Sequence, residues 1–150
     1  DSPAGIEKGA YLAMYFADKA IVVVNPEVSS VRDSDRILGL LASKTKRAED
    51  GERVQEYLLL TRYSPTRVEK GEMLSVTDVE EVLGLKAVGV IPESGDVLNA
   101  SNKGEPVILE SSSEAGQAYD DAVARLLGEA RPMRFTTLEK KGFFSKLFGG

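Results

Sequence analysis

The chain of 150 residues contains no cysteine and no histidine. Without cysteine there can be no disulfide, cysteine nucleophile or zinc-binding thiolate, and without histidine a Ser-His-Asp triad is excluded. Chemistry in this chain must therefore use carboxylates, hydroxyls, lysine, arginine and backbone groups. Magnesium is the metal ion that suits such oxygen ligands.

Long apolar runs and phosphate-binding loops are missing as well. No apolar run approaches the roughly 18 to 20 residues that a membrane-spanning helix needs. Neither GxGxxG nor GxxxxGK followed by Ser or Thr occurs, so the sequence has no glycine-rich phosphate loop. The chain also begins on Asp1, without an initiator methionine or a signal-peptide pattern. We therefore expect a sequence that starts within a domain, with any phosphate loop upstream of it.

The charge is unevenly distributed. The formal net charge of −5 argues against non-specific binding of nucleic acid by the body of the protein. Three lysines and one glutamate give residues 139–150 a charge of +2, which leaves −7 for the rest. Hydrophobic residues make up 42% of the chain, which is enough for a globular core. These features predict an acidic globular domain with a short basic tail.

Four short, continuous apolar runs predict buried strands. They lie at residues 20–24, 57–60, 87–91 and 107–109. Such runs are typical of a parallel sheet that is covered on both faces, and helical patterns separate them. The sequence therefore predicts an α/β fold with an open, mainly parallel sheet and flanking helices, joined by right-handed crossovers.

Three helices are expected between and after these runs. The first spans residues 29–47 and has an apolar stripe formed by Val31, Ile37, Leu38, Leu41 and Ala42. The second opens with a capping box of Thr77 and Glu80, and its inward side chains are Val79, Val82 and Leu83. The third is capped by Ser113, ends before Gly128 and has an apolar face formed by Ala115, Tyr119, Ala122, Val123 and Leu126.

Polar or turn-forming residues follow three of the expected strands, at 25–27, 61–63 and 92–95. Ligands of open α/β sheets bind outside the carboxyl ends of the strands, so these loops form the default candidate site. The alternative is that they are ordinary connections between elements.

The last 13 residues have the pattern of a short amphipathic helix. At 100° per residue, one face would carry Phe143, Phe144, Leu147 and Phe148, with Ser145 and Lys146 pointing away. Lys140 and Lys141 lie one turn earlier. Such a segment predicts weak, reversible binding to an anionic membrane, strengthened in a dimer by two copies. The alternative is a helix that docks onto its own domain.

Six segments of the chain resemble the MinD family of bacterial septum-site-determining ATPases. They are DSPAGIE at 1–7, NPEVSSVRDSDR at 25–36, LLLTRY at 58–63, VGVIPE at 88–93, ASNKGEP at 100–106 and KKGFFSKLFGG at 140–150. The resemblance spans the whole chain in order. On this resemblance, we expect residues 1–130 to be part of a P-loop ATPase domain, residues 131–137 to be a linker and residues 138–150 to be a membrane-targeting helix.

The resemblance implies a deviant Walker A ATPase of the ParA/MinD type, which uses ATP and magnesium and forms a homodimer around ATP. The dimer would sit on the cytoplasmic face of the bacterial inner membrane as a peripheral protein, bound to anionic lipids. There it would recruit MinC, while MinE would stimulate hydrolysis and release the dimer. Nucleic acid is not an expected partner.

The same resemblance assigns site residues. Asp1 would hold magnesium through water and act in catalysis together with Gly5, which shares a switch loop with Pro3 and Ala4. The adenine pocket would include Thr61, Arg62, Pro92 and Glu93, and the surface for the dimer partner, MinC and MinE would include Glu7, Ser29, Arg32, Asp33 and Asp35. The membrane residues would be Lys140, Lys141, Phe143, Phe144, Lys146, Leu147 and Phe148.

The sequence departs from the family in having no P-loop, no P-loop lysines and no first switch segment. We therefore expect these 150 residues alone neither to bind ATP tightly nor to hydrolyse it, because no phosphate cradle stabilises the transferring group. We also expect an open hydrophobic sheet edge that favours aggregation. Two other readings stay open at this point. One is a ParA-like DNA-partitioning ATPase, and the other is a non-catalytic module that binds membrane or partners.

Overall fold

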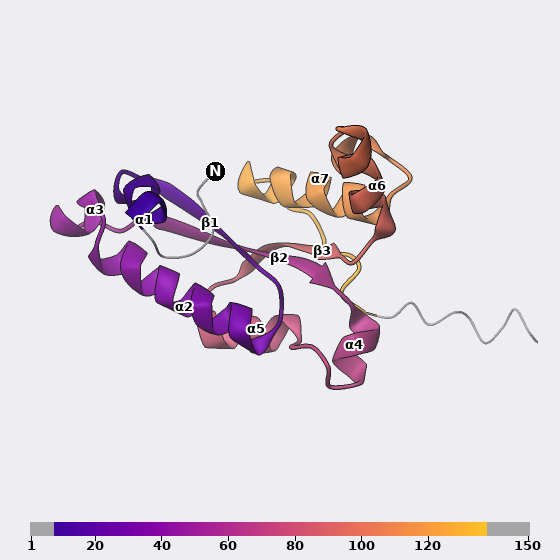
Figure 1. Cartoon of the computed structure of the whole chain (residues 1–150), viewed down its shortest axis with the longest axis horizontal. Coiled ribbons are helices and arrows are strands. Elements are labelled where there is room, and N and C mark those ends of the chain that lie inside the picture. Colours follow the sequence, from indigo (N-terminus) through magenta and orange to yellow (C-terminus); the bar gives the residue numbers. More distant parts are fainter. Residues whose placement is uncertain (1–7, 138–150) are drawn as a thin grey trace, which may run out of the picture.

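Three parallel strands form the centre of the computed structural model, which describes residues 8–137 of the chain. β1 (Lys19–Val24), β2 (Gln55–Tyr63) and β3 (Ala87–Pro92) lie side by side in that order, with β2 in the middle. The continuous apolar runs predicted all three. The parallel α/β fold is therefore confirmed, as Figure 1 shows.

Helices cover the sheet from both sides (Figure 1). α2 (Val28–Ser43) and α5 (Val76–Leu83) pack together on one face, and α7 (Glu114–Leu126) packs on the other face against β3. The remaining elements are α1 (Lys8–Tyr15), α3 (Lys46–Glu49), α4 (Pro65–Glu69), α6 (Gly95–Lys103) and the 3₁₀ turn η1 (Val107–Leu109).

Each face has its own hydrophobic core. Under α2 and α5, fully buried side chains include Val24, Leu41, Leu58, Leu60 and Val79. Between β3, α6, η1 and α7 lies a smaller core formed by Ile91, Ala100, Val107, Ala115 and Ala118. Each buried large aliphatic side chain stabilises the fold by about 1.5–3 kcal/mol, so these cores fix the positions of the strand ends.

The strand expected at 107–109 is wrong: these residues form η1. The Leu109 amide donates to the Pro106 carbonyl (3.1 Å) and the Glu110 amide to the Val107 carbonyl (3.0 Å), so the backbone bonds are satisfied within one turn. Val107 is buried against α7, whereas Leu109 is 75% exposed. Three apolar residues after a proline are too few to show a period, so sequence could not separate a strand from a turn.

The helix expected at 29–47 is interrupted. α2 ends at Ser43, and α3 begins after Thr45. The Thr45 hydroxyl donates to the Leu41 carbonyl (3.0 Å) and accepts from the Ala48 amide (3.2 Å). One buried side chain therefore ends one helix and caps the next. Ala42, expected in the apolar stripe, is exposed.

The capping box of α5 lies two residues earlier than expected. Ser75 accepts from the Asp78 amide (3.1 Å), and the Asp78 carboxylate accepts from the Ser75 amide (2.9 Å). Glu80 instead accepts from the Ala87 amide (2.9 Å). The expected inward position of Val82 is also wrong, because the buried stripe runs through Val79 and Leu83 and leaves Val82 60% exposed.

The expected ends of α7 are confirmed, but the expected burial of one residue on its apolar face is not. Ser113 accepts from the Gly116 amide (3.4 Å), and Gly128 follows the helix with φ +93°. The buried stripe runs through Ala115, Ala118 and Ala122. Val123 lies about 100° from Ala122 on the helix and is 45% exposed, so its expected burial is wrong.

β1 keeps one edge and one face open within residues 8–137. Its backbone pairs with β2 on one side, and no second pairing occurs in the part of the chain that the structure describes. Ile21 and Val23 are 49% and 59% exposed, on the face opposite α2. The expected aggregation through an open sheet edge stays a prediction. In the same residues, no helix has both the length and the apolar character needed to span a bilayer.

Candidate functional site

The carboxyl ends of the three strands meet at one edge of the sheet, because the strands are parallel. There the Thr61 hydroxyl at the end of β2 donates to the Asn25 side-chain oxygen after β1 (3.0 Å). The Glu93 amide after β3 donates to the Tyr63 carbonyl of β2 (2.9 Å). Residues 61–63, expected as a loop, form the end of β2, and Pro92 ends β3. The three segments that the sequence singled out are nevertheless joined directly by hydrogen bonds.

Arg62 adopts an unusual backbone conformation at this edge. Its φ is +56°, in the left-handed region that residues other than glycine seldom occupy, and the β2–β3 register shifts between Leu60 and Tyr63. The Arg62 guanidinium lies 4.0 Å from Glu93 Oε1, with side chains 71% and 48% exposed. An exposed ion pair contributes at most about 1 kcal/mol, so it does not account for the strained backbone. Strain of this kind is concentrated at functional sites.

A cavity of about 530 Å³ opens beside these residues. It is lined by Thr61, Arg62, Ile91, Pro92, Glu93, Ser94, Gly95, Val97, Leu98, Ser101 and Tyr119. All four residues assigned to an adenine pocket, Thr61, Arg62, Pro92 and Glu93, therefore line one space. The lining of this cavity combines aliphatic groups with a few hydroxyl and charged groups, which is typical of a site for a small molecule.

Seven of the eleven residues that line the cavity are not assigned from the sequence. Among them Tyr119 comes from α7, and burial raises the pKa of its hydroxyl, which stays neutral at physiological pH. Asn25 does not line the cavity, but it accepts the hydrogen bond of the Thr61 hydroxyl. The signal that could have found this pair is that Asn25 directly follows β1 at the level of Thr61 in β2.

A second apolar cavity lies further from the strand ends. It has a volume of about 380 Å³ and is lined by Val97, Ser101, Glu105, Pro106, Val107, Ile108, Tyr119 and Val123. It shares Val97, Ser101 and Tyr119 with the first cavity, but it contains none of the site residues assigned from the sequence. We therefore take the cavity at the strand ends as the candidate site.

The residues assigned to a partner surface lie at the beginning of α2. Ser29, Arg32, Asp33 and Asp35 are all exposed there. Arg36 Nη1 lies 3.7 Å from Asp33 Oδ1, one turn along the helix. These side chains form a mixed-charge surface on the outer side of α2, separate from the cavity.

Several assigned residues lie outside residues 8–137. They are Asp1, Pro3, Ala4, Gly5, Glu7 and the whole membrane-targeting segment from Lys140 to Phe148. Within residues 8–137, no group of three or more acidic side chains is close enough together to hold a metal ion. The roles assigned to Asp1 and Gly5 therefore stay predictions.

Comparison with curated proteins gives a relative that covers the whole chain. The septum site-determining protein MinD of Escherichia coli K12 is 66% identical over 151 aligned positions, which are 100% of this chain and 56% of that protein. The chain thus spans about half the length of the curated relatives it matches. No protein-family model matches the sequence.

Solved structures agree with this similarity. The MinD cell division protein of Aquifex aeolicus is 42% identical, with a TM-score of 0.80 over 89% of this chain and 54% of that chain. In the MinC:MinD cell division protein complex of the same organism, the matching chain is also 42% identical, with a TM-score of 0.78 over 89% and 52%. MinD of Pyrococcus horikoshii, complexed with Mg-ADP, shares the fold at 24% identity, with a TM-score of 0.69 over 85% and 50%.

Proposed function

We propose that this chain, whose sequence is similar to MinD over its whole length and whose described residues share the fold of MinD structures, is part of an ATPase that positions the bacterial division septum. The observation that carries the proposal is the convergence of Thr61, Arg62, Pro92 and Glu93 on one cavity at the sheet edge. The intact protein would form a homodimer around ATP and would act as a peripheral protein on the cytoplasmic face of the inner membrane.

The cavity fits the base of a nucleotide. Ile91, Pro92 and Val97 would offer apolar surface to a flat ring, and the Thr61 hydroxyl, which is held by Asn25, would offer a hydrogen-bonding group beside it. Magnesium and the phosphates would supply the reactive centre of ATP hydrolysis. In this chain Asp1 would hold the magnesium ion through water, and Gly5 would belong to the loop that senses the terminal phosphate.

The exposed beginning of α2 is the proposed surface for protein partners. Arg32, Asp33 and Asp35 present both signs of charge there, which favours partner selection by charge complementarity. Together with Ser29 and Glu7, they would form the face shared by MinC and MinE. Bound MinC would act as the division inhibitor, and MinE would stimulate hydrolysis and release the dimer.

The tail at 138–150 would provide the membrane contact, and vesicle sedimentation tests this role. Leu147→Glu places a charge on the predicted apolar face and should abolish binding of the chain to anionic vesicles. Ser145→Glu is the matched control, because it adds the same charge away from that face and should retain most of the binding. Equal sedimentation of the Leu147→Glu variant and the unmodified chain would exclude the membrane role.

ATP binding is a separate test. Without a P-loop, the 150 residues alone should show no micromolar affinity for ATP, because the phosphate cradle normally supplies most of the binding contacts. A nucleotide titration followed by calorimetry measures this directly. Micromolar binding would overturn the expectation that the nucleotide site is incomplete.

A further inference from the structure

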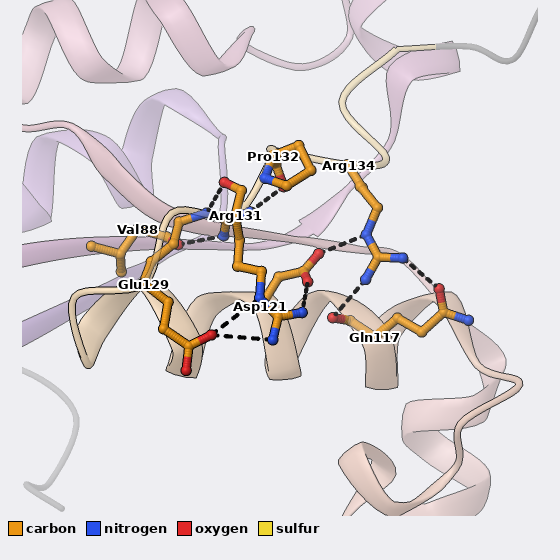
Figure 2. A network of polar contacts seen from close by, with 8 residues as sticks. Val88, Gln117, Asp121, Glu129, Arg131, Pro132 and Arg134 are labelled. Carbon is orange, nitrogen blue, oxygen red and sulfur yellow. Dashed lines mark hydrogen bonds and ion pairs between the residues drawn. The ribbon is translucent and has the colours of Figure 1, made fainter.

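The segment after α7 folds back along α7 and β3. We call residues 129–137 the strap. Arg125 of α7 donates to the carbonyl of Val88 in β3 (2.7 Å). The same guanidinium donates to the carbonyls of Arg131 (3.0 Å) and Pro132 in the strap, as Figure 2 shows. One side chain thus joins the first half of the strap to both α7 and β3.

A buried carboxylate of α7 holds the second half of the strap. The Asp121 side chain is only 4% exposed, and its Oδ2 accepts from Arg134 Nε (2.6 Å). Arg134 also donates to Gln117 Oε1 (2.9 Å) and to the Gln117 carbonyl (3.4 Å) (Figure 2). Because Gln117 and Asp121 are four residues apart, they lie on the same side of α7, and one guanidinium binds both. We call Arg134, Gln117 and Asp121 the clamp.

Two apolar side chains of the strap reach the cores on the two faces of the sheet. Met133 packs against the core under α2 and α5, and Phe135 packs against the core that contains Ile91. The Arg134 guanidinium lies 5.3 Å from the centre of the Phe135 ring, so the clamp and the ring are in contact with each other. Residues 131–135, which fall within the expected linker, therefore lie against the body.

The strap also lines a cavity of about 580 Å³ at the carboxyl end of the sheet. Phe135 and Thr136 line this cavity together with Pro92 and Glu93. Pro92 and Glu93 line the candidate site as well, so we call them the shared wall. The Glu93 amide donates to the Tyr63 carbonyl, which holds the shared wall from the side of β2. The two cavities therefore adjoin at the shared wall, and the strap lies next to it.

Backbone strain occurs in both cavities that adjoin at the shared wall. Within residues 8–137, Arg62 (φ +56°) and Phe135 (φ +61°) are the only residues other than glycine with a positive φ. Arg62 lines the candidate site, and Phe135 lines the adjoining cavity. Such a conformation persists only where the surrounding structure holds it. For Phe135 the surrounding contacts are the clamp, through Arg134, and the core at Ile91.

We propose that Arg134 is a positioning residue of the base-binding cavity. The clamp fixes the strap on α7, and the fixed strap holds Phe135 against the core at Ile91, next to the shared wall. A binding site keeps its geometry only while the side chains behind its lining are themselves held in place, so release of the strap should loosen the cavity. This inference rests on the proposed nucleotide role of the cavity and makes no use of the tail.

Adenosine is a probe that isolates the cavity, because it carries the base without the phosphates that a P-loop would bind. The full chain, labelled with ¹⁵N, is titrated with millimolar adenosine, and its amide signals are followed by NMR. The signals of Thr61, Arg62 and Glu93 should shift together and saturate with a dissociation constant in the millimolar range. The same titration then gives the adenosine affinity of each variant.

The variants remove either the clamp or the ring that the clamp positions. Arg134→Ala and Phe135→Ala should each weaken adenosine binding at least about fivefold. If Arg134 acts through Phe135, the double variant should lose no more affinity than either single variant, whereas independent effects would multiply. Asp121→Asn keeps the shape of the buried side chain, weakens the clamp from its other side and should reduce adenosine binding as well.

Arg47→Ala is the matched control for the loss of an arginine–carboxylate pair. The Arg47 guanidinium lies 2.6 Å from the Asp18 carboxylate, and its side chain is 35% exposed, compared with 40% for Arg134. Asp18 directly precedes β1, so this pair lies at the amino end of the sheet, away from the cavity. Arg47→Ala should keep the adenosine affinity of the unmodified chain. Circular dichroism confirms the fold of every variant.

A second measurement needs no substitution. The coupling between adenosine binding and strap docking is reciprocal, so adenosine must also stabilise the clamp. The Arg134 Nε hydrogen exchanges with water when its bond to Asp121 opens, and this exchange should slow when adenosine is bound. Exchange of the Arg47 Nε hydrogen, which is bonded to Asp18, should not change.

The outcomes separate the positioning role from the proposed function. If adenosine does not shift the cavity signals, the cavity does not bind the base, and both proposals are wrong. If adenosine binds but the folded Arg134→Ala and Asp121→Asn variants bind it as tightly as the unmodified chain, the nucleotide role stands and the positioning role is refuted. Multiplying effects in the double variant, or unchanged exchange at Arg134, would refute the positioning role as well.

Discussion

The contact between α7 and the elements around it can be tested with three glycine-to-alanine substitutions. At Gly116, in α7, a Cβ atom would lie 2.5 Å from the Val107 carbonyl oxygen and 2.7 Å from that of Glu110. At Gly89, in β3, it would lie 2.5 Å from Ala122 Cβ. At Gly39, in α2, nothing lies within 4 Å. The three positions therefore place the same methyl group in very different surroundings.

The expected changes in the free energy of unfolding follow from these distances. In the open helical position, Gly39→Ala should stabilise the chain by about 0.5–1 kcal/mol, because alanine loses less backbone entropy. Gly89→Ala should destabilise it by about 1–3 kcal/mol through overpacking. Gly116→Ala gains the same helix preference as Gly39→Ala but meets two backbone oxygens that cannot rotate away, so we expect a net loss of about 2 kcal/mol.

Urea unfolding followed by circular dichroism at 222 nm measures all three variants on one scale. Gly39→Ala serves as the control for helix propensity. If Gly116→Ala were as stable as Gly39→Ala, η1 would not lie against α7 as closely as the structure shows. The result also bears on the candidate site, because α7 carries Tyr119 of the cavity.

Three further predictions concern the cap of α5 and the exposed face of β1. Ser75→Ala should lower the free energy of unfolding by about 1 kcal/mol at pH 7, measured by urea titration; no loss would refute the cap. Hydrogen bonds from Ser75 lower the pKa of Asp78 below its ordinary value of 3.8. The ionised Asp78 carboxylate therefore stabilises the folded chain fully above pH 3.8, and this stabilisation is lost as the pH falls through the pKa of the folded state. Asp78→Asn should therefore differ from the unmodified chain at pH 7 and converge with it in acid; a constant difference would contradict this. The double variant Ile21→Lys, Val23→Lys should reduce aggregation, measured by light scattering, without unfolding the chain. Val22→Lys is the control and should unfold the chain, because Val22 is only 8% exposed. Unchanged scattering of the double variant would show that the exposed face of β1 does not drive association.

Local patterns in the sequence predicted the strands well, and they predicted the helix ends less well. Buried parallel strands need continuous apolar runs, and three of the four runs became strands. The run at 107–109 did not, because a sheet strand also needs a neighbour to pair with. Ser75 with Asp78 and Thr77 with Glu80 have the same capping-box spacing, and the structure forms the first of the two.

The candidate site was only partly visible in the sequence. Thr61, Arg62, Pro92 and Glu93 were assigned from strand ends and family resemblance, and the structure brings them to one cavity. The hydrogen bond between Asn25 and Thr61, and the wall formed by Tyr119, depend on register and on helix placement. Neither is encoded in a local pattern, because Asn25 and Thr61 are 36 residues apart and Tyr119 belongs to a different element from the other lining residues.

The sequence by itself predicted the parallel sheet and the amphipathic pattern of the tail, because composition and periodicity act within one element. It excluded thiol and imidazole chemistry outright, since neither side chain is present. Only the tertiary structure decided that residues 131–137 lie against the body. Asp121 and Arg134 are 13 residues apart and come from different segments, so their contact exists only once α7 has packed on β3 and residues 129–137 have turned back along it (Figure 2).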